Sequence, residues 1–187
     1  MNLNFPNLLT GFRVLLIPVI VVVYFMPFSW AAMASALIFM LASFTDWLDG
    51  YLARKLDQST PFGAFLDPVA DKLMVAVILV MLVDTYSNLW ITLPACVIIG
   101  REILISALRE WMAEIGQRAS VAVSYIGKVK TTAQMGSLVI LLAFPGGSWQ
   151  SYVGLAGLMI ATLLTLWSMI IYMKAAWPIL MGKRESH

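Results

Sequence analysis

The chain has 187 residues, of which 61% are hydrophobic and 12% are charged, and its mean hydropathy is +0.87. Ordinary globular chains have about 45–50% apolar and about 25% charged residues, so this composition excludes a soluble domain and predicts a polytopic membrane protein. The net charge of +2 is too small to indicate nucleic-acid binding. The single cysteine, Cys96, can form no disulfide within the chain. The single histidine is the terminal His187, which argues against Ser-His or Cys-His catalysis.

Six apolar stretches follow one another along the chain, each long enough to cross a membrane as a helix. We place them at 8–26, 31–53, 64–84, 90–113, 128–145 and 151–177. About twenty helical residues span the hydrocarbon core of a bilayer. The first stretch has no cleavage pattern and contains Arg13 and Pro18, so it predicts a retained helix and not a signal peptide. The sequence therefore predicts an all-α membrane protein with six transmembrane helices in a single domain, residues 1–187.

Lysine and arginine are distributed unevenly over the breaks between these stretches. The breaks near 27–30, 85–89 and 146–150 contain neither residue. The alternate side holds most of the basic residues, namely Arg54, Lys55, Arg118, Lys128, Lys130, Lys174, Lys183 and Arg184. Because loops rich in lysine and arginine stay in the cytoplasm, this pattern predicts that both termini are cytoplasmic.

Three polar residues spaced three apart, Asn7, Thr10 and Arg13, stand at the cytoplasmic start of the first stretch. One interpretation is that they contact the headgroup of a bound lipid. The other is that Asn7 and Thr10 only cap the helix.

Four of the six aspartates lie across the junction of the second and third stretches, in the pattern Asp46-x2-Asp49-Gly50-x2-Ala53-Arg54-x8-Gly63-x3-Asp67-x3-Asp71. The apolar residues between them argue against a solvated acidic loop. Like charges gathered at a membrane boundary need a cation, and carboxylates three or four residues apart lie on one helix face. Hard carboxylate oxygens select Mg²⁺ or Mn²⁺. We therefore predict that Asp46, Asp49, Asp67 and Asp71 hold one or two of these ions, most simply two.

This pattern resembles the signature of the CDP-alcohol phosphatidyltransferases, membrane enzymes that move a phosphatidyl group from a cytidine-linked lipid to an alcohol, and all eight fixed positions are filled. The resemblance implies that Gly50, Ala53, Arg54 and Gly63 contact the CDP moiety, as Asn7 and Thr10 would from the first helix. A guanidinium at Arg54 suits the diphosphate. For the small residues, the alternative is simple close packing of helices. The resemblance also implies a homodimer.

Asp71 lies deepest on the third stretch and resembles the proposed general base of this family. Its alternative role, as a metal ligand alone, stays open. In either case the reaction implied is phosphoryl transfer without a covalent enzyme intermediate, with metal ions bridging the diphosphate oxygens and stabilising the departing CMP.

A second charged group comprises Arg101-Glu102-x6-Arg109-Glu110 in the fourth stretch and Gly127-Lys128-x-Lys130-Thr131-Thr132-x-Gln134 at the start of the fifth. An ion pair of Arg101 with Glu102 or with a neighbouring helix is one interpretation, and positive-inside anchoring by the two lysines is another. We favour a cationic pocket for an anionic acceptor, with a polar stripe at Lys128, Thr131 and Gln134. The predicted acceptor-phosphate ligands are Arg101, Arg109, Lys128 and Lys130. The stretch also resembles the corresponding region of bacterial phosphatidylglycerophosphate synthases, whose acceptor is glycerol 3-phosphate.

The predicted function is transfer of the phosphatidyl group of CDP-diacylglycerol to glycerol 3-phosphate, giving phosphatidylglycerophosphate and CMP, at the cytoplasmic face of a bacterial inner membrane. The nearest alternatives are the same chemistry on serine, inositol phosphate or phosphatidylglycerol. A cation transporter would need carboxylates near the bilayer midplane and a polar path to both faces, whereas these carboxylates cluster at one face. A noncatalytic scaffold has no use for four carboxylates gathered with an arginine.

Overall fold

A computed structural model describes residues 5–56, 61–116 and 125–181 of the chain; within these ranges, the side chains of 5–8, 46–56, 61, 62, 64 and 125–128 are not described. Six α-helices occupy the described residues: α1 (Phe5–Tyr24), α2 (Ala31–Leu56), α3 (Pro61–Tyr86), α4 (Leu89–Glu114), α5 (Tyr125–Ala143) and α6 (Trp149–Leu180). Each helix ends within three residues of the stretch predicted for it, which confirms the all-α prediction. The number of membrane spans stays a prediction.

The described connections between helices are short and have local causes. The Asn88 side chain accepts a hydrogen bond of 2.9 Å from the Trp90 amide and caps α4, and Ser148 caps α6 in the same way. Gly146 and Gly147 adopt φ values of 72° and 80°. This left-handed conformation, which suits residues without a Cβ, reverses the chain between α5 and α6.

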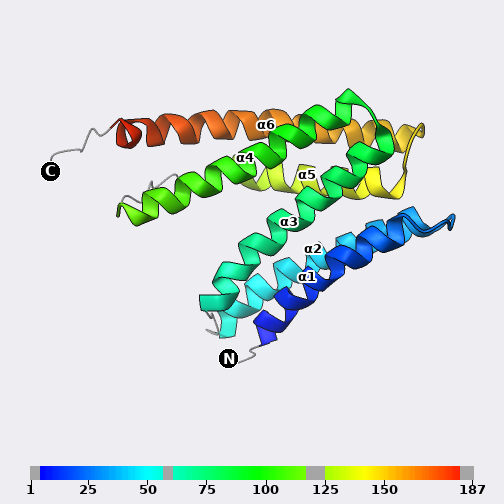
Figure 1. Ribbon diagram of the computed structural model, residues 1–187, viewed down its shortest axis with the longest axis horizontal. Coiled ribbons are helices and arrows are strands. Elements are labelled where there is room, and N and C mark those ends of the chain that lie inside the picture. Colours follow the sequence, from blue (N-terminus) through cyan, green and yellow to red (C-terminus); the bar gives the residue numbers. More distant parts are fainter. Residues whose placement is uncertain (1–4, 57–60, 117–124, 182–187) are drawn as a thin grey trace.

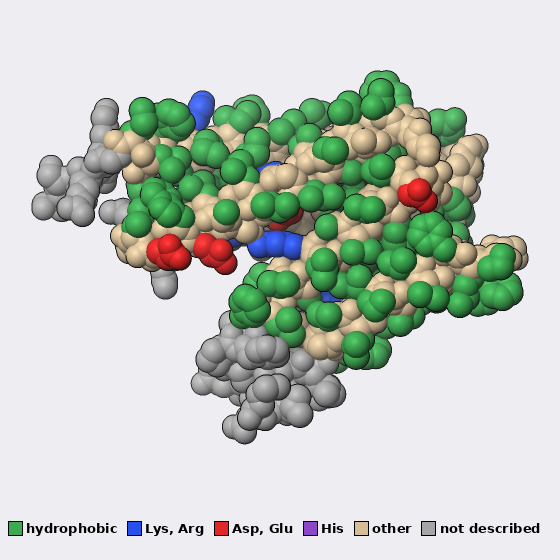
Figure 2. Space-filling view, viewed as in Figure 1, with side chains coloured by type: hydrophobic (Ala, Val, Ile, Leu, Met, Phe, Trp, Pro, Cys, Tyr) green, Lys and Arg blue, Asp and Glu red, His purple; other side chains and the backbone are tan. Residues whose placement is uncertain are grey.

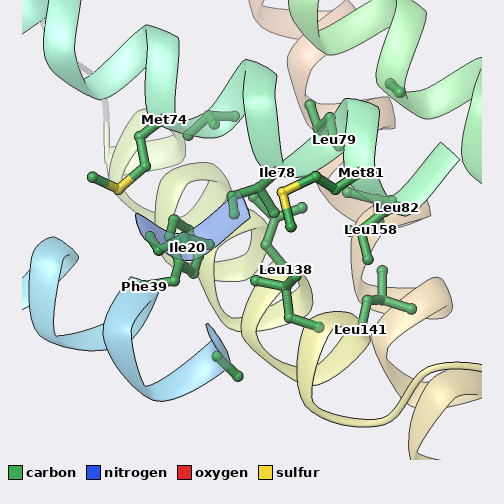
Figure 3. Packing of buried hydrophobic residues seen from close by; sticks show 14 of the residues in the cluster. Ile20, Phe39, Met74, Ile78, Leu79, Met81, Leu82, Leu138, Leu141 and Leu158 are labelled. Atoms are coloured by element: carbon green, nitrogen blue, oxygen red, sulfur yellow. The ribbon is translucent and has the colours of Figure 1, made fainter. Parts of the chain in front are cut away.

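The helices pack around one main core. α1 packs against α2 and α3, α5 packs against α2, α3 and α6, and α4 packs against α3 and α6. Figure 1 shows α3 crossing between the α1–α2 pair and the layer formed by α4, α5 and α6. Side chains from all six described helices meet in the core. Figure 3 labels ten that converge there from α1, α2, α3, α5 and α6: Ile20, Phe39, Met74, Ile78, Leu79, Met81, Leu82, Leu138, Leu141 and Leu158. Each of these is buried, so α3 is held in place from both sides.

The outer surface is strongly apolar. Large hydrophobic side chains such as Leu15, Phe65, Ile103 and Leu163 are exposed, and they cover most of the face seen in Figure 2. Of the described residues, α4 and α6 each form a helix long and apolar enough to cross a membrane. A soluble monomer rarely exposes apolar area on this scale, and lipid is the solvent that suits it.

The close approach of α5 and α6 depends on glycine, and replacing Gly154 with alanine is expected to destabilise the fold by about 1–3 kcal/mol through overpacking. A Cβ at this position would lie 2.9 Å from Leu141 Cγ, and Leu141 is fully buried, so it has no room to move aside. Gly136→Ala on α5 is the matched control, because no heavy atom lies within 4 Å of its Cβ position. Thermal unfolding in detergent should show a lower Tm for Gly154→Ala alone; equal Tm values for the two variants would contradict a tight α5–α6 contact.

Candidate active site

Two of the predicted metal ligands, Asp67 and Asp71, stand one turn apart on α3 and face α1. The Thr10 hydroxyl donates a hydrogen bond to Asp67 Oδ1, and Arg13 Nη1 donates to Asp71 Oδ1 over 2.7 Å. Both contacts join residues 57 or 58 positions apart, so α1 and α3 run parallel and successive turns of one meet successive turns of the other. The two carboxylates are therefore oriented by α1.

The Arg13 side chain is almost fully buried, with an exposed fraction of 1%, whereas the Asp71 side chain is 40% exposed. A buried guanidinium is tolerated only when it is paired, and the Asp71 carboxylate supplies the opposite charge. Asp71 thus presents one oxygen to a fixed cation and keeps a solvent-accessible edge. Such a carboxylate is held in one orientation while it stays open to a substrate.

Several predicted site residues stand where the structure describes no side chains, namely Asn7, Asp46, Asp49, Gly50, Ala53, Arg54 and Lys128. The backbone places Asp46 through Arg54 on the last turns of α2. Gly63, on the first turns of α3, is buried. The predicted contacts of these residues with CDP, with metal and, for Lys128, with the acceptor phosphate stay predictions.

The donor set of α3 fits a divalent cation in chemical type. Asp67 and Asp71 supply hard carboxylate oxygens on one helix face, which is what Mg²⁺ and Mn²⁺ prefer. Within the described side chains no three His, Cys, Asp or Glu residues come together. A complete ligand set therefore needs carboxylates beyond α3, and Asp46 and Asp49 of α2 are the sequence-predicted ones.

The second charged group meets at Glu102 on α4. Glu102 Oε1 accepts a hydrogen bond of 2.9 Å from Arg101 Nη1 and one of 3.4 Å from Lys130 Nζ on α5. The ion pair considered for Arg101 is thus present, and together with the contact of Lys130 it joins two of the predicted acceptor ligands, Arg101 and Lys130, to Glu102. Figure 2 shows basic and acidic side chains in a hollow of an otherwise mostly hydrophobic face.

The polar side chains that α5 buries are not the same set as the polar stripe predicted from spacing. Lys130, Gln134 and Ser137 are buried, with exposed fractions of 6%, 6% and 4%, whereas Thr131 is exposed. The buried set shares its helix face with Leu138 and Leu141 of the core, because residues three, four and seven apart lie on one side of a helix. Of the predicted stripe, Gln134 is among the buried residues and Thr131 is exposed, and the side chain of Lys128 is not described. Lys130 joins Gln134 on the buried face, and the role of the stripe in the acceptor pocket stays a prediction.

Arg109 makes a contact on α6 and is not part of the ion pairs at Glu102 that the structure describes. Its guanidinium carbon is 5.3 Å from the centre of the Tyr172 ring on α6, a distance suited to a cation–π interaction. It stands two turns further along α4 than Arg101. Its predicted role with the acceptor phosphate stays a prediction.

Sequence reasoning missed a link between the two charged groups. Lys72, the residue after Asp71, donates from Nζ to the hydroxyl of Ser106 on α4. Lys72 and Glu102 line the same cavity of about 260 Å³ between α3 and α4. Ser106 stands four residues after Glu102 and so shares its helix face. This spacing is the feature of the sequence that could have predicted the contact. The α4 face carrying Glu102 and Ser106 therefore meets both α3 and α5.

Comparisons with known proteins identify the family of the chain. The model of the CDP-alcohol phosphatidyltransferase family matches residues 3–180, and members of that family generally use divalent metal ions. The chain is 60% identical over 176 residues, 94% of its own length and 96% of the relative's, to a protein of Salmonella choleraesuis (strain SC-B67) named CDP-diacylglycerol–glycerol-3-phosphate 3-phosphatidyltransferase. Proteins of the same name from Shigella flexneri and Escherichia coli (strain K12) are 58% identical over the same share of each chain. With the signature aspartates in place and the match extending over nearly all of its length, the chain belongs to the CDP-alcohol phosphatidyltransferase family and is an enzyme.

Proposed function

We propose that this protein transfers the phosphatidyl group of CDP-diacylglycerol to glycerol 3-phosphate, with phosphatidylglycerophosphate and CMP as products. The observation that carries the proposal is identity of 58–60% over 94% of the chain with proteins whose names state this reaction. The paired carboxylates of α3 and the cations around Glu102 supply groups that such a reaction needs.

In the proposed reaction the acceptor hydroxyl oxygen attacks the phosphorus of the phosphatidyl group in line, and the bond from that phosphorus to the CMP oxygen breaks. The Asp71 carboxylate takes the hydroxyl proton, and the hydrogen bond from Arg13 holds it in orientation. Asp46, Asp49, Asp67 and Asp71 would hold Mg²⁺ or Mn²⁺, which supplies positive charge to the diphosphate and to the departing CMP. Arg54 and the small residues Gly50, Ala53 and Gly63 bind the CDP moiety in this scheme.

The acceptor is proposed to bind through its phosphate to Arg101 and Lys130, with Lys128 and Arg109 as further ligands. Glycerol 3-phosphate is nearly a dianion at neutral pH, so its site needs fixed cations that a neutral alcohol does not. Lys130 is inward-facing and joined to Arg101 through Glu102. One phosphate group can therefore contact both cations, Arg101 and Lys130.

Truncating Lys130 to alanine is expected to lower kcat/KM for glycerol 3-phosphate about tenfold to a thousandfold, because a charge-assisted phosphate contact is lost. The KM for CDP-diacylglycerol should change much less. Lys174→Ala, which removes an exposed lysine of α6, is the matched control and should leave both constants unchanged. If Lys130→Ala has the kinetics of the control, Lys130 does not bind the acceptor.

We also propose that the single domain crosses the bacterial inner membrane six times, with both termini and the active site at the cytoplasmic face, and that it forms a homodimer as the family resemblance implies. The exposed apolar side chains and the absence of lysine and arginine from 27–30, 85–89 and 146–150 support the topology.

Single cysteines test this topology in a Cys96→Ser background. Cysteines at Ser29, Ser87 and Ser148 are expected to react with membrane-impermeant thiol reagents added to intact cells. A cysteine at Ser59, which lies outside the described residues, is expected to react only after the cells are opened. Labelling at Ser59 from outside would invert the orientation and place the active site on the outer face.

The reaction itself is tested with purified protein in detergent, CDP-diacylglycerol and Mg²⁺, with CMP release as the readout. We expect release with glycerol 3-phosphate, and none with serine, inositol phosphate or phosphatidylglycerol. EDTA should stop the reaction. Preference for another acceptor would assign a different branch of the family, and no CMP release with any acceptor would contradict the proposed function.

A further inference from the structure

Glu102 occupies a position that the proposed reaction does not use. Its Oε1 atom accepts hydrogen bonds from both Arg101 Nη1, at 2.9 Å, and Lys130 Nζ, at 3.4 Å. One carboxylate oxygen thus contacts two cations that come from different helices. Glu102 also lines the cavity between α3 and α4, together with Lys72, the neighbour of Asp71 in sequence.

The geometry of the Arg101–Glu102 pair is not that of an ordinary pair on a helix surface. Residues at i and i+1 point about 100° apart around the helix axis and do not normally face each other. The Arg101 guanidinium is therefore drawn around α4 to the side where Glu102 meets Lys130. Without the carboxylate, the guanidinium would point elsewhere and the two like charges would repel each other.

The charge balance leaves this group positive. Two cations share one carboxylate, and a guanidinium has five N–H donors and an ammonium three, so their capacity exceeds what one carboxylate oxygen takes. Lys130 is buried, with an exposed fraction of 6%. Its ammonium group is therefore held in one direction by the side chains around it. The arrangement suits a dianionic phosphate, which two aligned cations bind better than two separate ones.

We propose that Glu102 is a positioning residue, which holds Arg101 and Lys130 together as one phosphate-binding pair for the acceptor. The inference rests on the proposed function, since it assigns the pair to the phosphate of glycerol 3-phosphate. Glu102 itself does not touch the acceptor. It sets the distance and direction of the two groups that do.

Positioning and simple charge make opposite predictions for the removal of this carboxylate. If Glu102 only offsets positive charge, its loss makes the pocket more positive and lowers the KM for a dianionic acceptor. If Glu102 positions the pair, its loss raises that KM although the pocket has become more positive. The sign of the change therefore separates the two roles.

The experiment compares Glu102→Ala, Glu102→Gln and the control Glu110→Ala with the wild-type protein in the CMP-release assay. Glu110 is an exposed glutamate on the same helix, and its variant is expected to match the wild type. Glu102→Ala should raise the KM for glycerol 3-phosphate about tenfold or more, the size expected when charged hydrogen bonds lose their alignment. Glu102→Gln should raise it less, because the amide oxygen still accepts from both cations. The KM for CDP-diacylglycerol should stay within about twofold.

Each outcome has a consequence. A lower or unchanged KM for glycerol 3-phosphate in Glu102→Ala, or equal changes in the KM values of both substrates, overturns the positioning role. Loss of the folded protein in both Glu102 variants, seen by size-exclusion chromatography and thermal unfolding, also overturns it and makes Glu102 a structural link between α4 and α5. Absence of glycerol-3-phosphate-dependent CMP release in the wild type is the distinct result that defeats the proposed function, and this inference with it.

Discussion

Replacing Asp67 with alanine is expected to lower kcat for CMP release by about a thousandfold or more and to leave a folded protein. Asp67 supplies one of the two carboxylates that α3 presents on one face, and Thr10 orients it. Under the proposed assignment, Asp67 would hold a metal ion. Its removal would then cost the positive charge that the ion would supply in the transition state, and the remaining ligands would not compensate for the loss. The measurement is single-turnover CMP release at saturating Mg²⁺.

The matched control is Asp84→Ala, which removes an exposed aspartate near the other end of α3. This variant should keep wild-type kcat. In EDTA the Tm of Asp67→Ala is expected to equal or exceed that of the wild type, because carboxylates gathered without their cation repel one another. Wild-type activity of Asp67→Ala, or of the wild-type protein in EDTA, would contradict the metal assignment.

Substituting Arg13 with leucine is expected to lower kcat about thirtyfold to a thousandfold. This corresponds to a loss of about 2–4 kcal/mol of transition-state stabilisation. The buried guanidinium donates to Asp71 over 2.7 Å, so its loss removes the contact that fixes this carboxylate on the side of α1. Arg13→Lys should recover part of the loss, because an ammonium keeps the charge but lacks the planar fork of donors. Steady-state kinetics with both substrates varied provide the test.

The kinetic constant that changes decides between two roles of Arg13. A fall in kcat with little change in either KM supports orientation of Asp71. A raised KM for CDP-diacylglycerol at unchanged kcat would instead support the interpretation made from sequence, in which Arg13 and Thr10 contact the headgroup of the lipid. Thermal unfolding of the variants in detergent controls for loss of the fold.

The sequence by itself determined the helices and the composition of the site. Apolar runs long enough to span a bilayer, separated by Pro, Gly and polar breaks, have few alternatives to helix, because lipid leaves backbone groups no partner outside their own segment. The four-residue spacing of Asp67 and Asp71 placed them on one face of α3 for the same local reason, the helical period. The signature residues also identified the family, since eight fixed positions carry more information than fold or composition.

Only the tertiary structure decided which residues of different helices meet. These contacts depend on the register and rotation of one helix against another, which the sequence of a single helix does not determine. The parallel register of α1 and α3 decided that Thr10 meets Asp67 and that Arg13 meets Asp71. The rotation of α5 turned Lys130 inward beside Gln134 and left Thr131 exposed, which the spacing of the polar residues alone did not reveal. These choices are fixed by how the apolar faces fill the core together, and a shift of one residue turns a helix by about 100° and presents a different face.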